Sequence, residues 1–167
     1  MDIHKNNQKN DSDMSFVEES VRARKAMALF KEGFNCAQSV FLAFEDLYSM
    51  DRTVALKLSS SFGGGMGRLR EVCGAVSGMF MVAGILYGYD SPDAYEEKTA
   101  HYERIQKLAH DFSSCTGSIV CRELLGLERK EDSPTPEKRS ETYYQKRPCV
   151  QMVGLAAALM EQYIEAQ

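Results

Sequence analysis

The sequence has no tryptophan and only 3 histidines among its 167 residues. It contains no HExxH motif, and His101 and His110 lie nine residues apart, a spacing that places them on opposite faces of a helix. No residue pattern indicates a Ser-His-Asp triad or a pair of catalytic carboxylates. The sequence therefore gives no support for a hydrolase or for a metal site built from histidines. We do not predict whether the chain is an enzyme.

The short motifs that usually place cysteines together are missing as well. The chain has 5 cysteines but no CxxC pair, so the spacing of a zinc ribbon is absent. It has no CxxCH motif either, so we expect no covalent attachment of a c-type haem. The cysteines are widely spaced, at Cys36, Cys73, Cys115, Cys121 and Cys149.

No cluster of basic residues is present, and the formal net charge is -4 at pH 7. Domains that bind nucleic acid carry a basic face, so we expect no nucleic-acid partner. Residues 1–13 are polar and lack the apolar segment of a signal peptide, which predicts a disordered tail and a cytoplasmic location. In a reducing compartment, the cysteines are expected to be free thiols, metal ligands or redox-active groups rather than structural disulfides.

No stretch shows sustained alternation of apolar and polar residues with β-branched side chains. We therefore predict an all-α fold, with residues 14–167 forming a single-domain helical bundle of about five or six helices. The charged residues of 127–139, with Pro134 and Pro136, predict an exposed loop. Apolar spacing predicts helices over residues 16–31, 36–48, 52–60, 72–89, 92–112 and about 147–164, and a short element over residues 118–125.

Several of these helices have a recognisable start. Ser15 with Glu18 three residues later predicts a capping box, and Asn35, Asp51 and Ser91 are further N-cap candidates. The apolar faces are expected to include Val54, Ala55, Leu58, Tyr95 and Tyr102.

A glycine-rich loop followed by an uncharged helix, residues 72–89, dominates the middle of the chain. The uncharged run only just reaches the length of a membrane span and has no companion, so we expect it to be a buried helix of the bundle. Glycine costs about 1 kcal/mol of helix propensity relative to alanine, so a helix face rich in glycine predicts close approach by a neighbouring helix or a bulky cofactor. The loop contains Gly63, Gly64, Gly65 and Gly67, and the small residues of that helix face are Gly74, Ser77, Gly78, Gly84 and Gly88.

Four of the cysteines, namely Cys36, Cys73, Cys121 and Cys149, fall in the first turn of a predicted helix. Free N–H groups and the helix dipole favour an anion there, which predicts lowered thiol pKa values. If the four starts converge, they can hold an iron-sulfur cluster or a zinc ion, or they can exchange disulfides. Buried cysteines without any function remain the alternative. Cys115 stands outside this group and is a candidate resolving thiol.

Five ordered blocks of the sequence resemble the family of redox-active proteins named for its C_GCAxxG_C_C pattern. The blocks are Asn35-Cys36-Ala-Gln-Ser-Val40, Phe62-Gly-Gly-Gly-Met-Gly67, Cys73-Gly-Ala-Val-Ser-Gly78, Cys121-Arg-Glu-Leu-Leu-Gly126 and Cys149. The resemblance covers residues 30–163 and implies a small helical protein whose four matching cysteines form the redox or metal site. It also implies electron transfer with an unknown redox partner, while Cys115 lies outside the pattern.

Three functions remain open from the sequence. In the first, the four cysteines ligate an iron-sulfur cluster or other metal, and the glycines at 63, 64, 65, 67, 74 and 78 surround this cofactor. In the second, low-pKa cysteines form a metal-free thiol-disulfide or sulfur-handling site. In the third, the glycine loop binds a small anion, with Arg68 and Arg70 either beside it or on the surface. The loop lacks the G-x-x-x-x-G-K-[ST] pattern of nucleotide-binding loops, and the glycine-bearing helix leaves room for a homodimer interface.

Overall fold

The computed structural model describes residues 14–128 and 133–167, so the disordered tail predicted for residues 1–13 lies outside the described residues. The prediction of an all-α fold is confirmed, because the described residues contain no strand and only one isolated β-bridge. None of the described helices is long and apolar enough to cross a membrane. The elements are α1 (Ser15–Glu19), α2 (Val21–Glu32), α3 (Cys36–Leu42), the 3-10 helix η1 (Glu45–Leu47), α4 (Arg52–Ser60), α5 (Gly63–Met66), α6 (Gly74–Tyr87), α7 (Tyr95–Thr116), α8 (Cys121–Leu124), α9 (Glu141–Lys146) and α10 (Cys149–Glu165).

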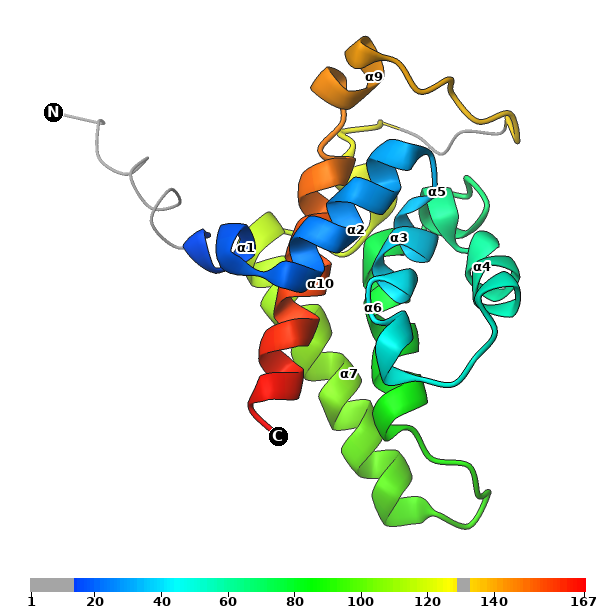
Figure 1. Ribbon diagram of the computed structural model, residues 1–167, viewed down its shortest axis with the longest axis vertical. Helices are drawn as coiled ribbons and strands as arrows, with labels where there is room; N and C mark the ends of the chain where they lie inside the picture. The colour runs from blue at the N-terminus through cyan, green and yellow to red at the C-terminus, as the bar shows by residue number, and fades with distance from the viewer. Residues whose placement is uncertain (1–13, 129–132) are drawn as a thin grey trace, which may run out of the picture.

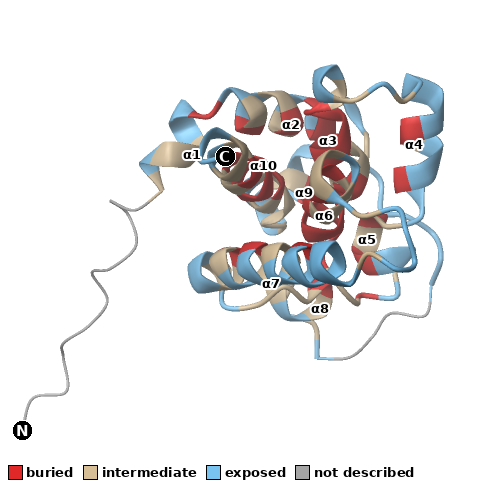
Figure 2. Ribbon diagram, turned by 90° about the horizontal axis from the view of Figure 1, so that it is seen from below, coloured by how far each residue is buried: buried red, intermediate tan, exposed pale blue. Residues whose placement is uncertain are grey.

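The longer helices pack around a shared core in which α10 lies against α2 and α6, and α3 lies against α6 (Figure 1). Buried residues concentrate on the facing sides of these helices, whereas α7 presents an exposed outer face (Figure 2). The largest fully buried side chains include Phe30, Phe41, Phe44, Phe112 and Met79. This core holds α3, α6 and α10 side by side, which fixes the relative positions of their first residues.

The uncharged helix α6 is buried as predicted, with 8 residues of its 14 buried. A Cβ added to Gly78 would lie 2.7 Å from the Ala37 carbonyl oxygen of α3, a distance that real side chains do not reach. A neighbouring helix therefore explains this part of the glycine face. Gly84, in contrast, has open space beside it, and Gly88 lies beyond the end of the helix.

The single helix predicted over residues 16–31 is instead two helices that meet at Ser20. The Ser20 hydroxyl accepts a hydrogen bond from the Ala23 N–H at 2.9 Å and so caps α2, whereas Ser15 makes no cap for α1. An extended N-cap conformation at Ser20 interrupts the helical path. The predicted stop at Gly33 is confirmed by its left-handed conformation, φ 113°.

The predicted N-cap of α3 at Asn35 is confirmed, and Gln38 completes a capping box that was not predicted. Asn35 accepts a hydrogen bond from the Gln38 N–H, and the Gln38 side chain accepts one from the Asn35 N–H. The helix nevertheless ends at Leu42 rather than near residue 48.

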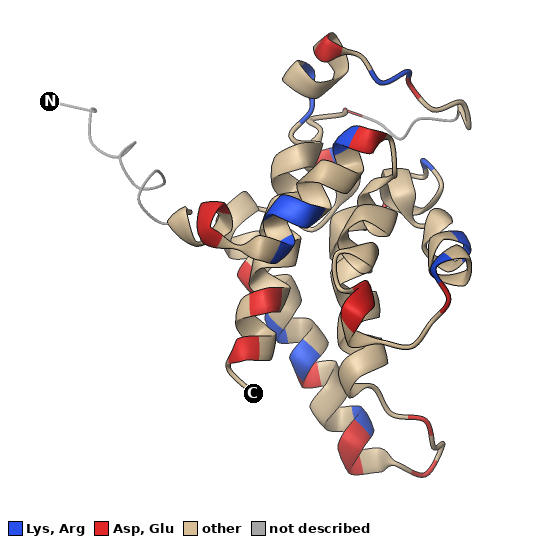
Figure 3. Cartoon of the chain, in the orientation of Figure 1, with Lys and Arg blue, Asp and Glu red and all other residues tan. Residues whose placement is uncertain are grey.

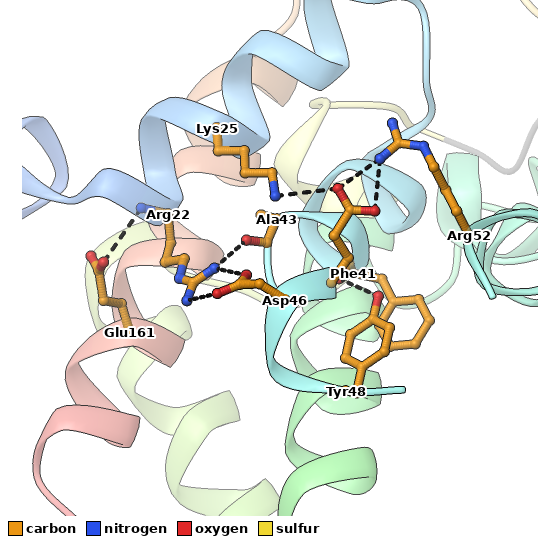
Figure 4. A network of polar contacts seen from close by, with 9 residues as sticks. Arg22, Lys25, Phe41, Ala43, Asp46, Tyr48, Arg52 and Glu161 are labelled. Atoms are coloured by element: carbon orange, nitrogen blue, oxygen red, sulfur yellow. Dashed lines mark hydrogen bonds and ion pairs between the residues drawn. The ribbon is translucent and has the colours of Figure 1, made fainter. Parts of the chain in front are cut away.

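A polar network accounts for this early end of α3 (Figure 4). Arg22 of α2 donates a hydrogen bond to the Ala43 carbonyl oxygen at 2.8 Å and pairs with Asp46, and its backbone N–H reaches Glu161 of α10. The Arg22 guanidinium thus satisfies the carbonyl oxygen of Ala43 at the end of α3, and the chain continues as η1 two residues later. The network ties together α2, α3 and α10 in a part of the fold that carries none of the cysteines.

Other predicted boundaries and faces need correction. Asp51 caps α4 as predicted, but Val54 and Leu58 are 52% and 50% exposed, and only Ala55 of the three is buried. Helix α7 begins three residues after Pro92, because the Ser91 hydroxyl closes a turn with the Asp93 N–H instead of capping a helix. Its predicted core residues Tyr95 and Tyr102 are 80% and 50% exposed.

The final part of the chain contains a helix, α9, that the apolar spacing does not predict. Ser140 caps it by accepting a hydrogen bond from the Tyr143 N–H at 3.2 Å. Residues 133–138 of the predicted loop are exposed and have no regular secondary structure, while residues 129–132 lie outside the described part. Figure 1 shows residues 133–138 and α9 at the end of the bundle where α3 and α10 begin.

Candidate functional site

Four cysteines from four separate elements line one cavity of about 270 Å³. Cys36 is the first residue of α3, as predicted. Cys121 and Cys149 lie in the first turns of α8 and α10, as predicted, and are the first residues of these helices, which begin two to three residues later than expected. Cys73 is the N-cap of α6, one position before the first turn in which it was expected. The structure therefore brings together the four sulfur-bearing residues that the sequence singled out.

Short backbone contacts hold two of these cysteines in register. The Cys73 N–H donates to the Ile119 carbonyl oxygen at 2.8 Å, and the Cys121 N–H donates to the Glu71 carbonyl oxygen at 2.6 Å. These hydrogen bonds flank the isolated antiparallel bridge between residues 72 and 120. The start of α6 and the start of α8 are thereby fixed next to each other, although they are far apart in the sequence.

The glycine loop also lines the cavity, and steric contact explains much of its composition. A Cβ on Gly65 would lie 2.6 Å from the Cys121 Cβ, and one on Gly63 would lie within 2.6 Å of three Asn35 side-chain atoms. A Cβ on Gly74 would lie 2.9 Å from the Phe62 carbonyl oxygen and 3.0 Å from the Cys36 Cβ. The glycines let the elements that carry the cysteines approach one another, and this packing is sufficient reason for their presence.

The backbone that follows Gly65 is unusual. Met66, Arg68 and Arg70 all have positive φ, at 68°, 70° and 59°, although none of them is glycine. Such conformations cost about 1–3 kcal/mol each and cluster at functional sites. Here they turn the chain so that two arginines line the cavity.

Arginine is the dominant charged residue of the cavity. The cavity is lined by Arg68, Arg70, Arg139 and Arg147, with Glu137 as the one carboxylate among the described lining residues. Figure 3 shows basic residues along the segment that leads into α9 and at the end of that helix. The expectation that Arg70 sits on the surface is wrong, because it is 2% exposed and its Nη1 lies 3.7 Å from the Cys121 Sγ.

Cys36 and Cys149 both line the cavity, at the starts of α3 and α10, which pack against each other, and both are partly exposed. The hydrogen bond from Cys36 lowers the pKa of Cys149 to about 7, with help from the positive charges of Arg147, Arg139 and Arg70 and against the effect of burial. The same bond, followed by burial, raises the pKa of Cys36 well above its ordinary value. The pair therefore has one thiol that ionises near neutral pH and one that keeps its proton.

The other two cavity cysteines do not have the lowered pKa that their places at helix starts predict. Burial raises the pKa of Cys73 to about 12, although the N–H groups of Ala75 and Val76 favour its thiolate. Burial also raises the pKa of Cys121, against the hydrogen bond and the charge of Arg70. The prediction of lowered thiol pKa values is wrong for these two, because loss of water outweighs the field at the helix start. It is also wrong for Cys36, whose pKa is raised first by the hydrogen bond with Cys149 and then by burial.

A single metal ion has no ready set of ligands in the described residues. No group of three or more His, Cys, Asp or Glu side chains is placed to hold one. The cavity lining nevertheless contains four thiols, the number that ligates a common iron-sulfur cluster.

Cys115 lies apart from the site. It is exposed, belongs to the last turn of α7, and is not among the residues that line the cavity. The helix runs to Thr116, four residues past its predicted end, which is why Cys115 is helical rather than in the connection that follows.

The sequence analysis did not predict that residues between Pro134 and Arg147 line the cavity. Arg139 donates to the Phe30 and Phe34 carbonyl oxygens at 2.9 and 3.1 Å and lies over the Phe30 ring, and Tyr143 is buried at the cavity wall. An N-cap signal, Ser140 before Glu-Thr-Tyr-Tyr-Gln-Lys, is present in the sequence, but residues 140–146 lie between the predicted loop and the predicted last helix and were assigned to neither.

A family model described as "Putative redox-active protein (C_GCAxxG_C_C)" matches residues 34–163, a range that includes all four cavity cysteines. No curated protein and no solved structure matches the chain.

Proposed function

The chain belongs to the C_GCAxxG_C_C family of redox-active proteins, and we propose that its redox centre is the Cys36–Cys149 dithiol. Cys149 acts as the attacking thiolate and Cys36 as the thiol that resolves the intermediate. The observation that carries this proposal is the placement of these two partly exposed thiols in one cavity with Arg139 and Arg147, where the pKa of Cys149 is lowered and that of Cys36 is raised.

The exchange follows ordinary thiol-disulfide chemistry. The Cys149 thiolate attacks one sulfur of an oxidised partner's disulfide, and the other sulfur leaves as a thiolate. Cys36 then loses its proton and attacks the Cys149 sulfur, which releases the partner's second sulfur as a thiolate. Cys36 and Cys149 end as a disulfide, and the partner gains two electrons as two thiols.

The arrangement of charges suits these roles. Thiolates are the reactive form, and a thiol that ionises near the ambient pH is the most effective attacker. The cavity arginines stabilise the negative charge that is shared among the three sulfurs during the exchange. In the reducing cytoplasm predicted from the sequence, the cell's thiols return the pair to the reduced form.

The test is to identify which disulfide forms first. Fully reduced protein is oxidised in steps with trans-4,5-dihydroxy-1,2-dithiane, quenched with acid, alkylated and mapped by mass spectrometry. We expect Cys36–Cys149 as the first bridge, and we expect Cys149→Ser and Cys36→Ser to abolish it. Cys115→Ser serves as the matched control, since it also removes one thiol but lies outside the cavity. A first bridge between any other two cysteines refutes the assignment.

A second candidate is supported by the four cysteines around one cavity. Cys36, Cys73, Cys121 and Cys149 would hold an iron-sulfur cluster, which would supply one-electron transfer to a redox partner. Arg70 beside Cys121 would offset part of the negative charge of the thiolates.

Anaerobic incubation with iron and sulfide separates the two candidates. Visible charge-transfer absorption and retained iron that both disappear in Cys73→Ser support the cluster, because Cys73 is not needed for the Cys36–Cys149 dithiol. Protein that retains no iron, yet forms the Cys36–Cys149 bridge, supports the dithiol and excludes the cluster.

A further inference from the structure

Tyr143 of α9 is the one aromatic residue among the described residues that line the cavity, and it is 9% exposed. The guanidinium carbons of two arginines lie over its ring, that of Arg139 at 4.9 Å and that of Arg147 at 5.1 Å from the ring centroid. The negative face of an aromatic ring attracts a guanidinium group within about 6 Å, and burial strengthens this attraction. One ring therefore contacts two cations at the wall of the cavity that contains the thiols.

The two arginines differ in what else holds them. Arg139 lies over the Phe30 ring at 4.0 Å and donates hydrogen bonds to two backbone carbonyl oxygens in and just after α2. Arg147 pairs with Glu137, whose side chain is 51% exposed. An ion pair with an exposed carboxylate contributes little, because water screens it. The Tyr143 ring thus gives the Arg147 guanidinium a buried contact that its carboxylate partner does not provide.

Both arginines act on Cys149. Arg147 lies two residues before Cys149 at the start of α10, and Arg139 lines the same cavity. The hydrogen bond from Cys36 is the largest cause of the lowered pKa of Cys149, and burial opposes it. The positive charges of Arg147, Arg139 and Arg70 add to the effect of the hydrogen bond. Two like charges repel each other, and long side chains keep their rotamer freedom in water unless a contact fixes them. The contact that keeps the guanidinium groups at the cavity therefore affects how readily Cys149 reacts.

Resting on the dithiol function proposed above, we infer that Tyr143 is a positioning residue of this site. Its ring holds the guanidinium groups of Arg139 and Arg147 beside Cys149, so it acts through the two arginines and takes no part in the exchange of bonds. Burial, followed by the charge of Cys149, raises the pKa of Tyr143 to about 12, so the hydroxyl is neutral at pH 7 and the ring carries the role. Helix α9 and the residues directly before and after it thus set part of the reactivity of a thiol on α10.

The experiment measures how fast iodoacetamide alkylates Cys149 in the reduced full chain at pH 7, by mass spectrometry of the Cys149 peptide. Tyr143→Leu removes the ring and should slow this reaction about threefold or more, since positive charges beside a thiol favour its reactive thiolate form. Tyr143→Phe keeps the ring and should restore the rate to within about twofold of the parent. Tyr144→Leu is the matched control and should react like the parent. It removes the neighbouring tyrosine of α9, which lies farther from Arg139, at 5.9 Å, and is not among the residues that line the cavity.

A double variant tests whether Tyr143 acts through an arginine. Arg147→Gln removes one of the two charges and should itself slow the alkylation of Cys149. If the ring acts by holding that charge, Tyr143→Leu combined with Arg147→Gln should slow the reaction by less than the product of the two single effects. Arg147 is chosen because Arg139 also makes hydrogen bonds that stabilise the fold. Slowing equal to the product overturns the inference, because the two residues then act independently.

Alkylation of Cys73 in the same digests reports whether the cavity stays intact. Cys73 is 7% exposed and should react equally slowly in the parent and in every variant. Slower alkylation of Cys149 together with faster alkylation of Cys73 overturns the inference, because Tyr143 would then cover the cavity rather than position the arginines. A Tyr143→Phe protein as slow as Tyr143→Leu also overturns it, because the effect would then belong to the hydroxyl.

The outcomes are distinct from those that test the dithiol function. A parent-like rate in Tyr143→Leu, with the Cys36–Cys149 bridge still forming on oxidation with trans-4,5-dihydroxy-1,2-dithiane, overturns the role of Tyr143 and leaves the dithiol function standing. Failure of that bridge to form in the parent protein overturns the dithiol function, while the alkylation rates still decide whether Tyr143 acts on Cys149.

Discussion

Removal of the Cys36 thiol tests the central electrostatic claim about the site. The hydrogen bond from Cys36 is the largest cause of the lowered pKa of Cys149, and burial acts in the opposite direction. In Cys36→Ala the donor is lost while burial remains, so the pKa of Cys149 should rise from about 7 toward or above its ordinary value of about 9. Cys36→Ser keeps a hydroxyl donor and should show a smaller rise.

The size of the effect follows from the two pKa values. At pH 7, a rise from about 7 to about 9 lowers the thiolate fraction from about one half to about 1%, roughly 50-fold. The more basic thiolate is the better nucleophile, with a Brønsted coefficient of about 0.4–0.5, which recovers about 6- to 10-fold. Disulfide exchange at Cys149 should therefore become about 5- to 8-fold slower at pH 7 in Cys36→Ala.

The assay measures iodoacetamide alkylation of the Cys149 peptide by mass spectrometry between pH 5.5 and 10. The parent protein should show a midpoint near 7, Cys36→Ala a midpoint at or above 9, and Cys115→Ser a midpoint equal to that of the parent. A parent midpoint near 9, or an unchanged midpoint in Cys36→Ala, would refute the reasoning. Circular dichroism of each variant confirms that the helical fold persists.

Three further perturbations address packing, the arginine contacts and buried ionisation. Gly78→Ala should lower the free energy of unfolding by about 1–3 kcal/mol in urea titrations because its Cβ meets α3, whereas Gly84→Ala, which has open space, should raise it by about 0.5–1 kcal/mol. Arg139→Ala should lower the free energy of unfolding by about 1.5–3 kcal/mol in the same titrations, since two charged hydrogen bonds to carbonyls are lost. Burial raises the pKa of Cys73, so the stability that its protonated thiol contributes is fully present below the unfolded-state pKa of about 9 and is lost as the pH rises toward about 12. Between pH 8 and 10.5, the free energy of unfolding of the parent should therefore fall by about 2 kcal/mol more than that of Cys73→Ala.

Each of these has a result that counts against it. Similar effects of the two alanine substitutions in α6 would mean that close approach to α3 does not explain the glycine face. An Arg139→Ala protein as stable as the parent would show that its contacts with the end of α2 contribute little. Parallel pH profiles for the parent and Cys73→Ala would mean that Cys73 is not desolvated in the fold.

The sequence was sufficient for the parts of the fold that depend on local signals. The Asn35 cap, the Asp51 cap and the stop at Gly33 all involve residues within one turn of each other, and all three are confirmed. The burial of α6 was also predictable, since an uncharged segment of that length has no stable alternative in a small water-exposed bundle. The four cysteines could be selected because each one lies at such a locally marked start.

Features that depend on distant contacts were not predictable in the same way. The helix predicted through residue 48 ends at Leu42, and the side chain that takes its terminal carbonyl is Arg22 from another helix. The apolar spacing of α4 is compatible with burial, yet the side chains of Val54 and Leu58 are exposed because none of the described helices packs over them. Arg139 reaches the cavity only because α9 folds over the end of α2, and neither the contact nor its partner leaves a pattern in the sequence.

The chemistry of the cysteines shows most clearly where local reasoning fails. A helix start stabilises an anion by about 0.3–1 kcal/mol, and by about 2 kcal/mol in the best cases. Because all four thiols lie at helix starts, this effect alone would lower the pKa of each of them. The rise in the Cys73 pKa from about 9 to about 12 corresponds to about 4 kcal/mol, so burial outweighs the helix term. Cys149 differs because it gains a thiol donor from Cys36 and the charges of Arg147, Arg139 and Arg70, all of which come from other parts of the fold or lie outside the cysteine pattern. The family pattern thus marks which thiols meet, while the hydrogen bond from Cys36 and the charges of the nearby arginines set which of them has the lowered pKa.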